Sequence, residues 1–288
     1  MRILYSSSSS NPVFFEEEDE NEDEDEPKTS PAFNRTRAPG LATVRLVFRR
    51  GPWQHPLKLR NSIMFIGHLA AGFAAKRTAP KVSLGVLIGA ACVLDLLWPI
   101  FLLVGWERVR IEPGNTAFTP LAFESYPFSH SLLAALGWSA LCGSIYWAIR
   151  RDRRGAGIVA ALVLSHWVLD ALSHRPDLPL TLTGSARVGL GLWNSVPATL
   201  VVEGAMFAVG IWLYAATTHA KDRVGRWGFV TFVGVLAWLY LANVFGPPPP
   251  NWQVIAWSDL AGILFAIWPA WFDGHRNCGP QSCENGFQ

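Results

Sequence analysis

Eight ionisable side chains lie inside, or at the mouth of, long apolar segments of the sequence. A charge in hydrocarbon is costly, so such residues usually serve a function. A helical rise of about 1.5 Å per residue, counted from the segment ends, places the set in one half of the bilayer. Polar residues that only support structure would not favour one leaflet, so the clustering predicts a site. The residues are His68, Asp95, His130, His166, Asp170, His174, Glu203 and Asp259.

The densest part of this set lies between Ser165 and His174. His166, Asp170 and His174 recur at every fourth position, so a helix would present them on one face. Two imidazoles and a carboxylate suit a divalent metal such as zinc, although Asp170 could instead orient a histidine. The same stripe would also suit a proton relay, or hydrogen-bonded contact between helices worth ~0.6 kcal/mol per bond. The other polar residues in the same leaflet favour a site.

Two further candidates stand close to prolines. His130 follows Pro127 and Ser129, which are typical of the first turn of a helix, and a helix start attracts anions. His130 would then hold a metal beside a phosphate or carboxylate, or else be an ordinary interfacial residue. Pro99 frees the backbone carbonyl of Asp95 one turn earlier, which predicts a kink there. A lone carboxylate at this depth is predicted to be a metal ligand or a paired acid.

The last three candidates stand further apart along the chain. His68 lies between Gly67 and Gly72, and glycines on a short helix permit close contact with a neighbouring helix. We expect His68 to be a metal ligand, with a structural hydrogen bond as the alternative. Glu203 and Asp259 are predicted general bases. Alternatively, they orient the ligands or pair with arginines of the outer loops.

Membrane-spanning helices are the elements expected to carry these residues. A helix needs roughly 20 mostly apolar residues to cross a bilayer, where it must satisfy its own backbone hydrogen bonds. The apolar segment 63–75 is too short to span alone. Residues 64–272 are therefore predicted to form an all-α, polytopic transmembrane helical bundle with six full spans and one short N-terminal helix. The spans are Val82–Val104, Phe128–Ile149, Ala156–Leu172, Pro197–Thr217, Trp227–Phe245 and Trp252–Trp271.

Basic loops predict the orientation of the bundle. They alternate with loops that are mixed or nearly uncharged, and the positive-inside rule places them in the cytoplasm of a bacterial inner (plasma) membrane. The polar set then lies in the outer half of the bilayer, and the tail 273–288 is cytoplasmic. The net charge of +2 gives no sign of a nucleic-acid partner, so the expected partner is membrane lipid. The basic residues are Lys76, Arg77, Lys81, Arg150, Arg151, Arg153, Arg154, Lys221, Arg223 and Arg226.

Residues 1–63 differ in composition from everything that follows. They contain a serine run and ten acids between Glu16 and Glu26, and then a basic stretch with prolines. Such a composition cannot bury a core, so disorder is expected. The short helix ends at cytoplasmic Lys76, so a long acidic leader would have to cross the membrane or loop back. We hypothesise that Met64 is the true start, with a cytoplasmic leader as the alternative.

The spacing of the polar residues resembles the bacterial family of membrane-bound metal-dependent hydrolases, which is related to phospholipase C and P1-type nuclease zinc enzymes. The resemblance is carried by Gly67-His68, Leu94-Asp95, Phe128-Ser129-His130-Ser131 and Ser165-His166 with Asp170. It implies that five residues are metal ligands, namely His68, Asp95, His130, His166 and Asp170. Leu97, Trp98, Ser125 and Tyr126 stand where the family has further polar residues. His174 would supply a replacement ligand.

These residues together predict a metal-dependent membrane hydrolase. The cofactor would be one divalent ion, zinc first, which activates a bound water. The substrate would be a phosphate ester at head-group depth, such as a lipid or isoprenoid head group. A proton relay or transport path would instead need polar residues that continue to the inner face, where the sequence has almost none. A purely structural stripe is the third alternative.

Overall fold

The computed structural model describes residues 66–279. The predicted leader 1–63, the proposed start at Met64 and the last part of the predicted tail, 280–288, lie outside this range. The described residues form ten α-helices, two short 3₁₀ helices and six short strands. They are α1 (Ile66–Ala75), α2 (Leu84–Ala91), α3 (Val93–Leu103), β1 (Arg108–Ile111), β2 (Leu121–Ser125), α4 (Pro127–His130), α5 (Leu132–Arg150), α6 (Arg153–Ser173), β3 (Leu178–Pro179), β4 (Arg187–Val188), η1 (Leu192–Asn194), α7 (Val196–Thr217), β5 (Thr218–Ala220), α8 (Arg223–Phe245), α9 (Trp252–Leu260), η2 (Ala261–Ile263), α10 (Leu264–Gly274) and β6 (Arg276–Cys278).

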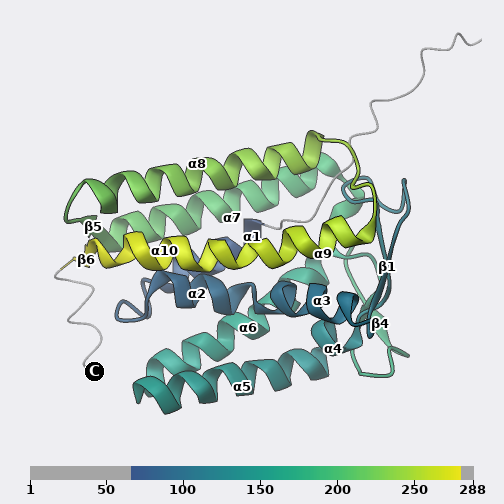
Figure 1. The fold of residues 1–288 in the computed structure, drawn as a ribbon, viewed down its shortest axis with the longest axis horizontal. Coiled ribbons are helices and arrows are strands. Elements are labelled where there is room, and N and C mark those ends of the chain that lie inside the picture. Colours follow the sequence, from purple (N-terminus) through teal and green to yellow (C-terminus); the bar gives the residue numbers. More distant parts are fainter. Residues whose placement is uncertain (1–65, 280–288) are drawn as a thin grey trace, which may run out of the picture. The chain divides into compact units, whose positions relative to one another are not determined.

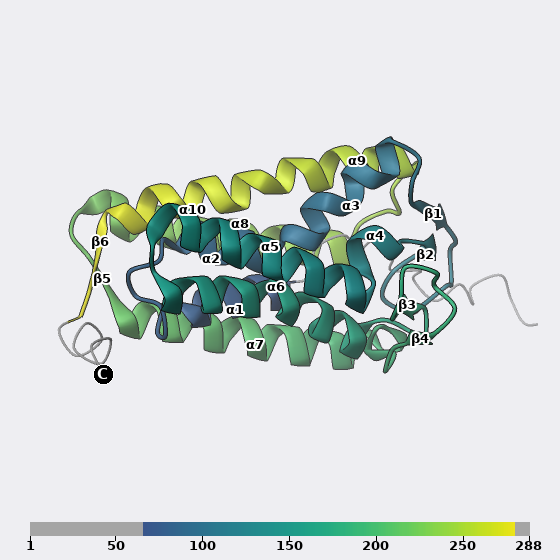
Figure 2. The same cartoon turned by 90° about the horizontal axis from the view of Figure 1, so that it is seen from below.

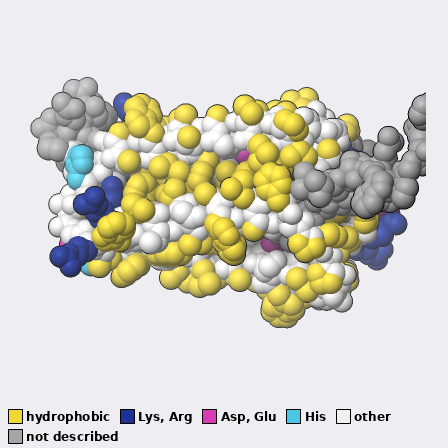
Figure 3. Space-filling view, turned by 90° about the horizontal axis from the view of Figure 1, so that it is seen from above, with side chains coloured by type: hydrophobic (Ala, Val, Ile, Leu, Met, Phe, Trp, Pro, Cys, Tyr) yellow, Lys and Arg dark blue, Asp and Glu magenta, His cyan; other side chains and the backbone are white. Residues whose placement is uncertain are grey.

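The described chain is the all-α bundle of a multi-pass membrane protein, which confirms the predicted fold class. Five helical segments are long and apolar enough to cross a membrane, namely α5, α6, α7, α8 and the continuous α9–α10 unit. The pair α2 and α3 makes up to six spans if it counts as one, and α1 is too short to span alone, as predicted. Figure 3 shows a hydrophobic face between two ends that carry the lysines and arginines.

Polar caps mark where the long helices begin. The side chains of Ser131, Asp152, Ser195, Asp222 and Asn251 each accept a hydrogen bond from a backbone N–H in the first turn of α5, α6, α7, α8 and α9. Such caps satisfy backbone donors that have no partner within the helix. The caps therefore fix the helix boundaries at the two ends of the spans.

The short helix α1 lies inside the bundle, packed against α7, α2 and α6. Figures 1 and 2 show α5 beside α6, and α10 beside α8 and α2. A Cβ atom at Gly210 of α7 would lie 2.6 Å from the Ala70 carbonyl oxygen of α1. Only glycine permits this approach, so α1 can sit close to its neighbours and carry His68 into the interior.

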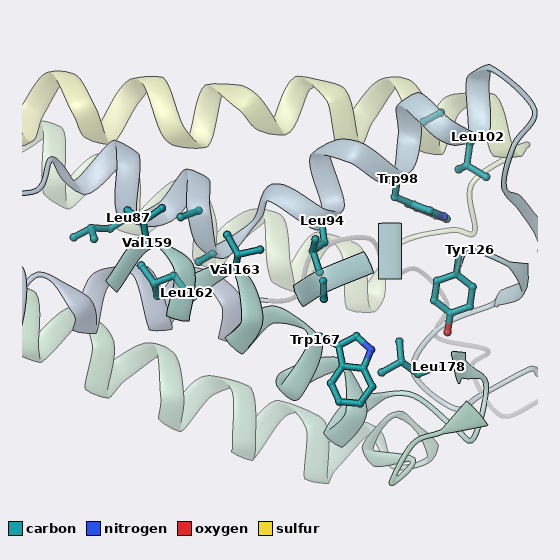
Figure 4. Packing of buried hydrophobic residues seen from close by; sticks show 14 of the residues in the cluster. Leu87, Leu94, Trp98, Leu102, Tyr126, Val159, Leu162, Val163, Trp167 and Leu178 are labelled. Atoms are coloured by element: carbon teal, nitrogen blue, oxygen red, sulfur yellow. The ribbon is translucent and has the colours of Figure 1, made fainter. Parts of the chain in front are cut away.

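Two hydrophobic clusters fill the space between the helices. The first runs from Leu87 and Val159, between α2 and α6, to Trp98, Tyr126 and Leu178 beneath the loops (Figure 4). The second surrounds α1 and includes its buried Phe73.

The predicted span Val82–Val104 is broken rather than continuous. Helices α2 and α3 meet at Cys92 with a bend of 53°. The kink was predicted at Asp95 because of Pro99, and that position is wrong, because Asp95 and Pro99 both lie inside α3. The break instead precedes Asp95 and leaves the carbonyl oxygen of Ala91 bonded to the imidazole of His166 on α6. A contact between helices thus replaces part of the backbone ladder.

The two ends of the bundle carry short strands. The hairpin β1–β2 and the pair β3–β4 lie at one end, which we call the loop end, and the pair β5–β6 lies at the other (Figure 1). The residues after 272, predicted to form a cytoplasmic tail, begin with the end of α10 and the strand β6. Strand β6 pairs with β5, with Cys278 opposite Thr218, and the Cys278 thiol contacts the Pro80 carbonyl oxygen.

Candidate metal centre

Four of the predicted ligands meet near the loop end of the bundle. Asp95 comes from α3, His130 from α4, and His166 and Asp170 from α6. The Nε2 atom of His166 lies 3.4 Å from Asp95 Oδ1 and 3.3 Å from Asp170 Oδ2. The Nε2 atom of His130 lies 3.5 Å and 3.7 Å from the same two oxygens. Two imidazole nitrogens and two carboxylate oxygens therefore point at a common centre.

Asp95, His130 and His166 form a group whose ligand atoms all lie within 4.8 Å of one another and which could hold a zinc ion, and Asp170 lies beside this group. Zinc binds histidine nitrogen and carboxylate oxygen at about 2.0–2.2 Å, and a regular tetrahedron with that radius has ligand atoms about 3.3–3.6 Å apart. The four contacts between imidazole and carboxylate span 3.3–3.7 Å. Two carboxylates would also balance the charge of a divalent cation. The group of Asp95, His130 and His166 could therefore hold one such ion, with Asp170 at its edge.

The other ring nitrogen of each histidine is held in the orientation that a metal ligand needs. His166 Nδ1 lies 2.7 Å from the Ala91 carbonyl oxygen, which only accepts, so Nδ1 carries the hydrogen. His130 Nδ1 lies 2.7 Å from Ser129 Oγ, and Ser129 donates to Glu107 at 2.7 Å, so His130 is also the donor in its pair. Metal-binding histidines usually have such an outer partner, which fixes the tautomer and frees Nε2.

His68 lies beside this centre rather than within it. Its Nε2 atom lies 3.4 Å from Asp170 Oδ1, the carboxylate oxygen turned away from His130, and 3.2 Å from the His166 carbonyl oxygen. Its ring stacks on that of His166 at 3.7 Å between centroids. His68, His166 and Asp170 still form a group with ligand atoms within 4.8 Å of one another. The contacts favour a role in which His68 orients Asp170.

His174 does not join the predicted stripe. Helix α6 ends at Ser173, and His174 has the extended backbone of a helix cap, so its side chain leaves the face shared by His166 and Asp170. His174 Nδ1 instead lies 3.0 Å from Asp177 Oδ1 and 3.3 Å from the Tyr126 hydroxyl. Its ring lies against Trp193 at 4.4 Å between centroids. The placement leaves His174 outside both groups of described residues that could hold a metal ion.

The two predicted general bases have different surroundings. Asp259 lines the same cavity as three of the candidate metal ligands, Asp95, His130 and Asp170. Glu203 does not line it and is fully buried on α7. The side chains of Tyr240 and Trp193 lie close to the Glu203 carboxyl, although no described partner reaches hydrogen-bond geometry with it. Asp259 therefore remains a candidate for chemistry, whereas Glu203 lies behind the cavity wall.

The cavity itself is small and closed above by aromatic residues. Its volume is about 50 Å³, which is enough space for a few water molecules. His68, Asp95, His130, Asp170, His174 and Asp259 supply its ionisable lining. Phe118, Phe123, Tyr126 and Trp193 form the wall toward the loops. A metal with its bound water and one small polar group would fill this space.

Three polar residues of the site were missed by the sequence reasoning. Glu107 accepts hydrogen bonds from the backbone N–H groups of Phe128 and Ser129, both at 2.8 Å, and so holds the start of α4. Tyr126 donates to Asp177 at 3.1 Å, and this pair positions His174. All three stand in segments expected to be loops. Pro127 marks the start of α4 in the sequence. Nothing in the sequence shows that Glu107, twenty-one residues before Phe128, accepts the hydrogen bonds of this helix start.

Glu107 and Tyr126 lie outside the spanning segments, and the pKa values of both are raised. Burial raises the pKa of the Glu107 carboxyl above its ordinary value, and hydrogen bonds from Ser129 oppose the shift. Burial, followed by the negative charge of Asp177, raises the pKa of the Tyr126 phenol well above its ordinary value. Tyr126 therefore stays protonated and acts as a hydrogen-bond donor in the site.

We expect Glu107→Gln to weaken metal binding by about 10- to 100-fold, the cost usually found when an outer partner of a ligand is changed. An amide nitrogen facing Ser129 would reverse its hydroxyl, which would then donate to His130 Nδ1. The hydrogen on His130 would move to Nε2 and block the ligand atom. Zinc titration with a competing chelator measures the effect. The exposed Glu112→Gln is the control, and equal affinity in the two variants would contradict the role of Glu107.

Comparison with known proteins leaves the site to be argued from its geometry. No family model, no curated protein and no solved structure matches the chain.

Proposed function

We propose that the chain is a metal-dependent membrane hydrolase that cleaves a phosphate ester at head-group depth. One observation carries the proposal: Asp95, His130, His166 and Asp170 bring four ligand atoms to separations of 3.3–3.7 Å between imidazole and carboxylate. A zinc ion held by such a set would polarise a phosphoryl oxygen and lower the pKa of a bound water to about 7.

The chain's own residues would then divide the remaining work. Asp95 and Asp170 neutralise the metal, while Ala91 and Ser129 hold the two imidazoles with Nε2 inward. His68 contacts Asp170 and fixes the direction of its carboxylate. Each of these contacts sets a ligand before substrate arrives, which is how pre-organised sites lower a barrier.

Proton transfer is assigned to residues that line the cavity without joining the metal-binding group. His174 is held by Asp177 and Tyr126, and a histidine paired with a carboxylate is a common general acid or base. Asp259 faces the cavity from α9, on the other side of Asp95. We assign proton transfer to the leaving group to His174 and acceptance of the proton from water to Asp259.

The location of the cavity favours an ester at the membrane surface. Thr119, Leu121 and Tyr126, which belong to the segments of the loop end, line its upper part, and residues inside the helices line its lower part. Arg175 and Arg187 lie in the loops of the same end, where cations would attract an anionic head group. The predicted orientation places this end outside the cell.

The test is hydrolysis of phosphate monoesters and diesters by the purified full chain in detergent micelles. We expect turnover that stops after treatment with a chelator and returns when zinc is added back. Asp259→Asn should lower kcat by about 10²–10⁴-fold, as for the loss of a general base, while leaving bound zinc in place. Metal-bound protein that cleaves none of these esters would refute the hydrolase.

A structural role is the alternative that the contacts also support. The His–Asp contacts join α1, α3, α4 and α6, so they would hold these helices together without any metal. That role predicts a protein that purifies without metal and unfolds when the histidines are replaced.

A further inference from the structure

A second cavity of about 260 Å³ lies next to the metal centre. Leu239 and Asn243 of α8 form one wall, and Ser258 and Phe265 of the α9–α10 segment form another. Asp95 and Asp259 line both this cavity and the smaller one described above. Two carboxylates therefore mark the junction between the metal centre and a larger space among the spanning helices.

The walls of this lateral cavity change character along the membrane normal. Asn243 lies near the loop end of α8, and Ser258 and Asp259 lie in the half of the α9–α10 segment that begins at the loop end, whereas Asp95 lies at the start of α3 beside the metal centre. Deeper into the span the lining is apolar, with Leu69, Ile88, Gly89, Phe265 and Ala266. A lipid of one leaflet has the same polarity, with its head at the surface and its chain toward the midplane.

The cavity is also open to the side from which a lipid would come. Ser258 of its lining is exposed, and Asn243, Asp259 and Gly262 are half-buried, so the cavity reaches the outer surface of the bundle. Figure 3 shows acidic side-chain atoms within the hydrophobic face of the bundle. An apolar cavity of ~150 Å³ already accommodates a benzene ring, so a space of about 260 Å³ can hold a segment of hydrocarbon chain.

We propose that the lateral cavity binds the hydrocarbon chain of the substrate, so that the substrate is a long-chain phosphate amphiphile that enters from the bilayer. The inference rests on the proposed hydrolase and adds the class of molecule that it cleaves. The phosphate reaches the metal centre past Asp95 and Asp259, while the chain stays between α8 and the α9–α10 segment. A short water-soluble ester has the same phosphate but gains nothing from the apolar wall.

The first test measures binding without catalysis. The full chain in lipid nanodiscs is treated with a chelator, and equilibrium binding of dodecylphosphonate and ethylphosphonate is compared, with empty nanodiscs as the blank. We expect saturable binding of dodecylphosphonate that is at least about tenfold tighter than that of ethylphosphonate, because burial of apolar surface drives it. Equal affinities for the two compounds would overturn the proposal, whatever the outcome for any variant.

A cavity-filling variant locates the site. A Cβ atom at Gly262 meets nothing closer than 3.9 Å, so Gly262→Leu is tolerated and places its side chain in the cavity. Gly234→Leu is the matched control, because Gly234 is exposed on α8 and also has open space around it. We expect Gly262→Leu alone to weaken dodecylphosphonate binding by at least about tenfold. Unchanged binding in a folded Gly262→Leu protein would overturn the proposal.

Measurements of turnover distinguish the proposed chain-binding site from the hydrolase activity on which it rests. In the zinc-loaded protein, Gly262→Leu should raise KM for dodecyl phosphate and leave hydrolysis of ethyl phosphate unchanged. Chain-dependent binding without hydrolysis of either ester would refute the proposed function and support the chain site. Hydrolysis of both esters with equal kcat/KM would support the hydrolase and refute the chain site.

Discussion

Replacement of His166 by alanine is expected to reduce bound zinc from about one ion per chain to a level below detection. His166 is fully buried and contacts both carboxylates of the centre, so its loss removes a ligand that no other described side chain is placed to replace. Loss of an outer partner alone costs about 10–100-fold in metal affinity, and loss of a ligand should cost more. Asp170→Asn should act in the same direction, because it removes half of the negative charge.

Mass spectrometry of metal content in the detergent-purified protein measures the loss. His219→Ala is the matched control, because His219 is an exposed histidine on β5 at the opposite end of the bundle. Thermal unfolding of each variant shows whether it is folded. A folded His166→Ala protein with wild-type zinc would contradict the metal centre. Wild-type protein that takes up no zinc after reconstitution would also contradict it, and would favour the structural role.

Several of the polar residues that the sequence placed at a similar depth do lie close together, because depth follows from counting residues along a helix. Asp95, His130, His166 and Asp170 were all predicted ligands, and the structure brings them together. Periodicity predicted His166 and Asp170 on one face of a helix, and both lie on one face of α6. His174 broke the pattern, because α6 ends one residue before it. The end of a helix depends on contacts with distant segments, such as that of His174 with the Tyr126 hydroxyl, and spacing alone does not reveal it.

The break at Cys92 shows a second limit of the same kind. Proline chemistry predicted a kink at Asp95, yet α3 continues through Pro99. The bend occurs where the Ala91 carbonyl oxygen bonds to His166, seventy-five residues away. Glu107 likewise joins the site through a contact with Ser129 that no local pattern reports. Sequence reasoning found the residues that touch the proposed metal, but not those that hold them in place.

Replacement of Asp273 by alanine is expected to lower the free energy of unfolding by about 3–5 kcal/mol, the usual cost of breaking a buried ion pair from one side. Asp273 Oδ2 accepts from Lys76 Nζ at 2.6 Å and from the Leu84 backbone N–H at 2.9 Å, and Oδ1 accepts from the Tyr214 hydroxyl at 2.8 Å. The pair is buried, although Lys76 was predicted to be an ordinary loop cation. Loss of the Asp273 carboxylate would leave the Lys76 ammonium group without its acidic partner at the junction of α1, α2, α7 and α10.

Reversible unfolding in mixed micelles measures this change. The exposed Glu112→Ala should have little effect, because its contact with Arg110 is a surface ion pair. The double variant Lys76→Met with Asp273→Leu should recover part of the loss, since an apolar pair of similar volume leaves no charge unpaired. A single Asp273→Ala variant as stable as the wild type would show that Lys76 finds water or another acceptor when its partner is gone.

Zinc content of the Asp273→Ala protein tests whether the metal centre depends on the ion pair at the other end of the bundle. The network of Lys76, Asp273 and Tyr214 lies at the β5–β6 end, whereas the metal-binding residues lie near the loop end. Helices α1 and α2 connect the two, because α1 carries His68 and the end of α2 supplies the Ala91 carbonyl oxygen. If the network only holds the helices together, a folded variant keeps its zinc. Loss of zinc in a folded variant would mean that the metal centre depends on how α1 and α2 are held a full span away.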